Sequence, residues 1–78
     1  EMVYNNEPLS RVISDIEAKF GVKISIKGNT NIEKCPFTSR SLKNNTLEEI
    51  LSIIEATLSA KIVKKGVGEY QLSGLSCS

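Results

Sequence analysis

The side chains that could do chemistry are few, and they do not combine into a catalytic or metal-binding pattern. The chain has no histidine, which removes the usual general base near neutral pH and the commonest metal ligand. The two cysteines, Cys35 and Cys77, lie far apart and would need carboxylate partners to complete a tetrahedral zinc site. Asp15, Glu48 and Glu49 are expected on helix surfaces or at a helix start. We therefore predict that the protein is not an enzyme and has no cofactor and no metal site.

The glycines and lysines near the C-terminus also have a simple explanation. Gly66-Val67-Gly68 lacks the following helix that a phosphate-binding loop requires, so it predicts a hairpin turn. Lys61, Lys64 and Lys65 could form a small RNA-binding patch, but they equally suit an edge hairpin that must stay soluble and unpaired. The net charge of +1 provides no general attraction for nucleic acid or anionic lipid. No nucleic-acid partner is expected, and an RNA-binding module remains a weaker alternative.

The two cysteines leave two interpretations open at this point. An even number in a small domain permits one disulfide, which would imply an oxidising compartment. They could equally be unrelated thiols, Cys35 in a strand and Cys77 in a frayed tail. The chain contains neither an apolar run long enough to span a bilayer nor a visible signal peptide, and we interpret it as a piece of a longer protein.

The elements that would position these residues occur in two similar copies. One apolar pattern with helical spacing occurs twice: Leu9, Val12, Ile13, Ile16 and Phe20, then Leu47, Ile50, Leu51, Ile54 and Leu58. At the same offset, Glu17 corresponds to Glu55 and Lys23-Ile24 corresponds to Lys61-Ile62. The match continues beyond the helices, so we infer two copies of one strand–helix–strand unit.

The first unit is expected to contain a short strand around 2–4, a helix from about residue 9 and a strand over 22–27. Asn6 or Glu7 would cap this helix, with Pro8 in its first turn and Gly21 as a left-handed C-cap. The second strand is predicted because apolar residues alternate with polar ones over 22–27.

The second unit is expected to begin with a strand over 34–40. Thr46 and Glu49 fit a capping box at the start of its helix. Strands over 60–64 and 69–72, joined across a glycine-containing turn, would then form a hairpin.

These elements predict one α+β domain over residues 1–78, with the order β-α-β-β-α-β-β. Two packed helices would be covered by small sheets around a mostly aliphatic core. The strands that flank each helix are expected to be parallel, with a right-handed crossover. Short sheets offer unpaired edges that can recognise a partner by strand addition, although the parent protein could also cover them. Our predicted contact edges are Phe37, Thr38 and Ser39 in the third strand and Val67, Glu69, Tyr70 and Gln71 in the final hairpin.

Several motifs together resemble the C-terminal domain of FecR-type anti-sigma regulators. They are Tyr4-Asn5-Asn6-Glu7-Pro8-Leu9, Val12-Ile13, Phe20-Gly21-Val22-Lys23-Ile24, Cys35-Pro36-Phe37-Thr38, Asn45-Thr46-Leu47-Glu48-Glu49-Ile50-Leu51, and Tyr70-Gln71-Leu72-Ser73-Gly74 followed by Cys77. The chain departs from the pattern at Ser39-Arg40-Ser41, where relatives more often carry a hydrophobic or aromatic residue.

The resemblance implies a periplasmic signal-relay domain of a regulator anchored in the inner membrane through an upstream segment. The cytoplasmic part of such a regulator holds a sigma factor, and the periplasmic part senses a TonB-dependent outer-membrane transporter by touching its N-terminal signalling domain. Similar sequences are familiar from Bacteroidetes. The alternative is the signalling domain of a transporter or secretin itself, which has a similar fold of repeated β-α-β units.

A periplasmic location would also favour oxidation of the two cysteines. The resemblance therefore implies a disulfide between Cys35 and Cys77 that ties the C-terminal tail to the third strand. On the chain-entropy model, such a bridge contributes about 4 kcal/mol, less any strain.

Overall fold

The computed structural model describes residues 2–27 and 35–74. Its elements are β1 (Tyr4–Pro8), α1 (Leu9–Phe20), β2 (Lys23–Ile26), β3 (Pro36–Ser39), α2 (Leu47–Leu58), β4 (Lys61–Gly66) and β5 (Glu69–Ser73). This order confirms the predicted β-α-β-β-α-β-β arrangement and the α+β class. Neither helix of the described ranges has the length and apolar composition needed to cross a membrane.

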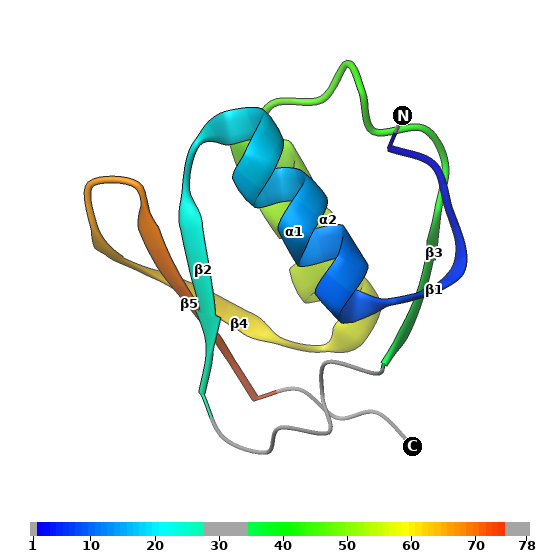
Figure 1. Ribbon diagram of the computed structural model, residues 1–78. Coiled ribbons are helices and arrows are strands. Elements are labelled where there is room, and N and C mark those ends of the chain that lie inside the picture. Colours follow the sequence, from blue (N-terminus) through cyan, green and yellow to red (C-terminus); the bar gives the residue numbers. More distant parts are fainter. Residues whose placement is uncertain (1, 28–34, 75–78) are drawn as a thin grey trace.

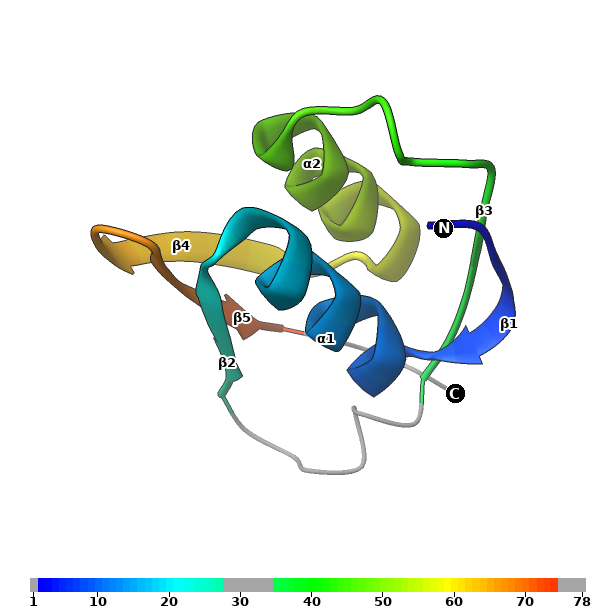
Figure 2. The ribbon, with the colours of Figure 1, turned by 45° about the horizontal axis from the view of Figure 1, so that its top comes forward.

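The strands form two small sheets. β1 and β3 make an antiparallel pair, and the other sheet has the order β2-β5-β4, with β2 parallel and β4 antiparallel to the central β5. Figures 1 and 2 show the two helices side by side, with the β1–β3 pair at one side of them and the three-stranded sheet at the other. This bears out the expected packing of two helices covered by small sheets.

The expected parallel pairing of the strands that flank each helix is wrong. Each helix leads the chain from one sheet to the other: α1 connects β1 to β2, and α2 connects β3 to β4. The flanking strands therefore never pair with each other, and within the described residues the parallel pair is formed by β2 and β5. The helices act as spacers between two sheets and do not form crossovers above one sheet.

Several strand ends also differ from the sequence-based expectation. β1 runs from Tyr4 to Pro8, later than the predicted 2–4, and β3 runs from Pro36 to Ser39, whereas 34–40 was expected. Residue 34 itself lies outside the described residues. The final hairpin is longer than expected, because β4 extends to Gly66 and β5 to Ser73.

The start of α1 is held by the backbone of the residue that directly precedes β3. The N-cap residue is Pro8, and it has no side-chain cap, so the predicted capping by Asn6 or Glu7 is wrong. Both residues belong to β1, and the Leu9 N–H donates to the carbonyl oxygen of Cys35 at 2.8 Å. A backbone acceptor next to β3 thus replaces the side-chain cap that the sequence suggested.

The remaining predicted helix ends are confirmed. Thr46 Oγ1 accepts from the Glu49 N–H at 3.2 Å, while Glu49 Oε1 accepts from the Thr46 N–H at 2.9 Å, which is the expected capping box. Gly21 ends α1 with a φ of 66°, in the left-handed region that glycine adopts at little cost. Ser59 occupies the same position after α2 with a φ of 52°, although it is not a glycine.

The described core is a single cluster that joins both helices and both sheets. Its fully or nearly fully buried members include Leu9, Val12, Ile16, Ile50, Ile54 and Leu72. The described core is mostly aliphatic, as predicted, and two aromatic residues are among its largest members. The rings of Tyr4 and Phe37 meet edge to face with centroids 5.9 Å apart, so β1 and β3 are joined by a ring contact as well as by backbone pairing.

Candidate docking surfaces

The predicted contact edge in β3 is available only in part. The Phe37 side chain is 1% exposed because it packs into the core, so it cannot touch a partner. Thr38 is exposed, and its hydroxyl accepts from the Asn6 N–H at 2.9 Å. Ser39 is half-buried. Thr38 and Ser39 remain predicted contacts, whereas Phe37 is corrected to a core residue.

The predicted edge in the final hairpin is wrong for a different reason. β5 is the central strand, so its backbone is paired with β2 on one side and β4 on the other. Glu69, Tyr70 and Gln71 therefore offer side chains to a partner but no free backbone edge. Val67 is 97% exposed at the turn between β4 and β5, and it remains a possible side-chain contact.

Among the described strands, three of the four sheet edges carry features that discourage strand addition. β1 has an irregular register between Tyr4 and Glu7, and Asn6 adopts a positive φ of 56°. β3 begins with Pro36, which has no backbone N–H to donate. β4 has an irregular register between Lys64 and Gly66. Bulges and prolines are devices by which proteins protect sheet edges.

The β2 edge is regular. Its parallel register with β5 runs without interruption from Lys23–Glu69 to Ile26–Leu72. The Lys23 N–H donates to Gly68 O and the Lys27 N–H to Leu72 O, each at 2.8 Å. Because backbone groups alternate in direction along a strand, the N–H and C=O groups of Ile24 and Ile26 point away from β5.

A groove runs beside this edge. It has a volume of about 390 Å³ and is lined by residues of α1 and β2: Ser10, Ile13, Lys23, Ile24, Ser25 and Ile26. The Glu17 carboxylate occupies the outward N–H of Ile24 on this edge, because Glu17 Oε2 accepts from that N–H at 2.9 Å. The outward groups of Ile26 lie further along β2, so a regular stretch of backbone borders a partly apolar groove.

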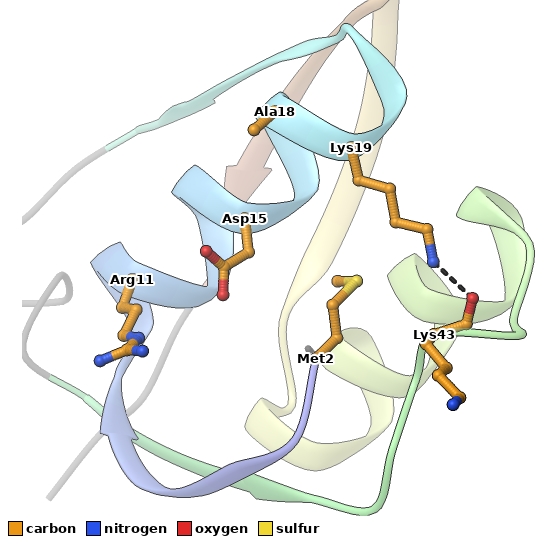
Figure 3. A pocket seen from close by; sticks show the side chains of 6 residues that line it. All are labelled: Met2, Arg11, Asp15, Ala18, Lys19 and Lys43. Atoms are coloured by element: carbon orange, nitrogen blue, oxygen red, sulfur yellow. Dashed lines mark hydrogen bonds between the residues drawn. The ribbon is translucent and has the colours of Figure 1, made fainter.

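A second hollow lies between α1, the N-terminal segment and the loop before α2. It measures about 430 Å³ and is lined by Met2, Arg11, Asp15, Ala18, Lys19 and Lys43 (Figure 3). Figure 3 shows the Lys19 amino group donating to the carbonyl oxygen of Lys43, while the Lys43 side chain points away. The polar groups here hold neighbouring segments onto α1, so we interpret this hollow as structural.

One interaction at this hollow involves a buried phenol. The Tyr4 hydroxyl donates to Asp15 Oδ2 at 2.8 Å, and Tyr4 is 2% exposed. Burial raises the pKa of Tyr4 well above its usual value, and the hydrogen bond to Asp15 and the Asp15 charge raise it further. The phenol therefore stays protonated and acts as a fixed hydrogen-bond donor.

The cysteines are only partly covered by the structure. Cys35 is fully buried beside the start of β3, and Cys77 lies outside the described residues. The Cys35–Cys77 bridge therefore stays a prediction. Across residues 2–27 and 35–74, no group of three or more metal-ligating side chains comes together.

The sequence did not identify the β2 edge as the open one. The alternation over 22–27 predicted a strand with one buried face, and the structure confirms it, since Ile24 is buried while Lys23 and Ser25 are exposed. Which strand lies at an edge depends on pairing between distant segments. No local motif in β2 carries that information.

Comparison with known proteins gives a consistent result. The sequence model of one protein family, "FecR, C-terminal", matches residues 1–68. Two crystal structures, each of a candidate anti-sigma factor from Parabacteroides distasonis, superpose with TM-scores of 0.81 and 0.79 at 23% and 22% identity. Each match covers 96% of this chain and 34% of the other, so the chain spans about a third of those proteins. At this identity the likeness establishes the fold. No curated protein matches the sequence.

Proposed function

The chain belongs to the FecR C-terminal domain family, and from that premise we propose that it is the signal-relay domain of a membrane-anchored anti-sigma regulator. The family match over residues 1–68 is the observation that carries this proposal. The similarity in fold to candidate anti-sigma factors supports it. In the full-length regulator, an upstream segment would anchor the protein in the inner membrane, and a cytoplasmic part would hold the sigma factor.

In this proposal the domain works in the periplasm by docking, without chemistry. Its partner is the N-terminal signalling domain of a TonB-dependent outer-membrane transporter. Reversible docking would change how the regulator presents its cytoplasmic part to the sigma factor. The described residues are consistent with such a role, because their core forms one cluster and no buried side-chain nitrogen or oxygen lacks a partner. A stable body of this kind can offer a preformed surface at little cost in ordering.

The proposal is tested by measuring binding of the purified chain to a panel of purified transporter signalling domains by isothermal titration calorimetry. The matched negative controls are the plug domains of the same transporters, purified without the signalling domain. We expect one or more signalling domains to bind and the plug domains not to bind. If no signalling domain from the organism that encodes this chain binds, the proposed partner is wrong.

A further inference from the structure

We infer that the docking edge is β2, and that it receives an extended, acidic segment of the partner protein as an additional strand. This inference rests on the proposed docking function and specifies the surface that performs it. It adds, to the predicted contacts that remain, an edge that the order of the described sheet leaves open.

The backbone of β2 carries the first part of the argument. An added strand needs outward N–H and C=O groups in a regular row, and β2 pairs with β5 without a register shift. Glu17 already occupies the outward N–H of Ile24. The C=O of Ile24 and both backbone groups of Ile26 therefore form the usable part of the edge. An incoming strand can bind these groups without displacing Glu17.

The groove beside β2 gives the added strand a place for its side chains. Ile13, Ile24 and Ile26 contribute apolar surface, and Ser10 and Ser25 contribute hydroxyl groups. In strand addition, the backbone bonds provide affinity and pockets for alternate side chains provide specificity. The groove fits a segment that alternates apolar residues facing α1 with polar residues facing the outer side of the sheet.

Charge determines what the polar residues of that segment should be. Five of the ten basic residues of the chain lie on the three-stranded sheet or directly after β2. Lys23 lies on β2, Lys27 follows it, and β4 carries Lys61, Lys64 and Lys65. Of the nine acidic residues, only Glu69 lies on these strands, opposite Lys23 in the register. Exposed Lys23 and Lys27 stand at the two ends of the β2 edge. They favour an acidic segment and repel a basic one.

Two matched pairs of variants test this inference against the signalling domain that binds the wild-type chain most tightly. The first pair adds one backbone methyl group to the nitrogen of Ile26 or of Lys64, in chains assembled by chemical ligation at Cys35. Ile26 lies on the β2 edge and Lys64 on the opposite β4 edge. We expect methylation at Ile26 to weaken binding at least about tenfold, because it removes an outward donor and covers the edge. Methylation at Lys64 should leave the dissociation constant unchanged.

The second pair reverses charge: Lys23→Glu with Lys27→Glu, against Lys61→Glu with Lys64→Glu. Both double variants change the net charge equally, but only the first changes the β2 edge. We expect the first to weaken binding by about tenfold or more at low salt, and the difference from wild type to shrink as salt rises. Thermal unfolding of each variant checks that the fold is kept.

The outcomes separate this inference from the proposed function. If the wild-type chain binds and both members of each pair bind equally well, the proposed function stands and β2 is not the docking edge. Stronger loss from the β4 variants than from the β2 variants would also overturn the inference. If the wild-type chain binds no signalling domain, both proposals fail.

Discussion

Glu17 Oε2 accepts a hydrogen bond from the backbone N–H of Ile24 at 2.9 Å, and this bond ties α1 to the first residues of β2. The second unit repeats it, because Glu55 Oε2 accepts from the Ile62 N–H at 2.8 Å over the same separation of seven residues. In each unit the bond occupies an outward N–H at the start of an edge strand. The sequence repeat is therefore also a repeat of one structural device.

We predict that Glu17→Ala lowers the free energy of unfolding by about 1–2 kcal/mol, because the Ile24 N–H loses its acceptor in a partly buried position. Glu17→Gln should lose less, since its amide oxygen can still accept. Urea denaturation of the purified chain measures both. Glu48→Ala is the matched control, because Glu48 is an exposed helical glutamate. A loss from Glu48→Ala equal to that from Glu17→Ala would contradict this explanation.

We predict that substitutions at the two C-cap positions change the stability of the domain in opposite directions. Ser59 holds a φ of 52°, which strains a residue with a Cβ, so Ser59→Gly should stabilise the domain by about 0.5–1 kcal/mol. Gly21 holds a φ of 66°, so Gly21→Ala should destabilise it by about 1 kcal/mol. A Cβ at Gly21 would meet no atom within 4 Å, so the cost is conformational and not steric.

Thermal and urea unfolding of the two C-cap variants give the required free energies. Ser73→Gly is a useful control, because Ser73 lies in β5 and its φ is not positive. If Ser59→Gly and Ser73→Gly both destabilise the domain to the same extent, strain at Ser59 is not significant.

Local features were predictable from the sequence because they depend on neighbouring residues. The left-handed cap at Gly21 and the capping box of Thr46 and Glu49 both depend on residues within one helical turn. The helix start at Leu9 was not predictable in this way. Its acceptor is the carbonyl oxygen of Cys35, which only tertiary packing brings near.

The candidate docking edge was less predictable than the fold. Strand pairing joins residues that are distant in sequence, so the central place of β5 and the edge place of β2 could not be derived from local alternation. The burial of Phe37 had a local signal. Cys35 and Phe37 alternate with Pro36 and Thr38, and the structure puts the first two inside and the last two outside.

We predict that the contribution of Tyr4 to the stability of the domain is smaller at alkaline pH than at neutral pH. Its hydroxyl donates to Asp15, so Tyr4→Phe should cost about 1 kcal/mol at pH 7 while keeping the ring contact with Phe37. The pKa of Tyr4 is raised in the folded state, first by burial and then by Asp15. The stabilising effect is therefore fully present below the unfolded pKa of about 10 and falls as pH rises above it.

Urea denaturation of wild type and Tyr4→Phe between pH 7 and about pH 11 checks this sign. The stability difference between them should shrink above about pH 10, because the unfolded wild-type chain then loses the Tyr4 proton while the folded chain keeps it. Tyr70→Phe controls for the loss of a less buried hydroxyl. A difference that stays constant over this range would show that Tyr4 titrates normally in the folded protein, and one that grows would show that its folded pKa is lowered.

The predicted Cys35–Cys77 bridge has a direct chemical test. We expect the native, unreduced chain to have a mass about two hydrogens below that of the reduced chain and to take up no alkylating reagent. Cys77→Ser should then lower the free energy of unfolding by about 2–4 kcal/mol in oxidising buffer, because the unfolded chain regains the freedom that the bridge removes. In reducing buffer the variant and wild type should be equally stable. The substitution is made at Cys77 so that the buried Cys35 side chain stays in place and no cavity forms in the core. Two alkylatable thiols in protein from an oxidising compartment would exclude the bridge and leave the periplasmic location supported by the family alone.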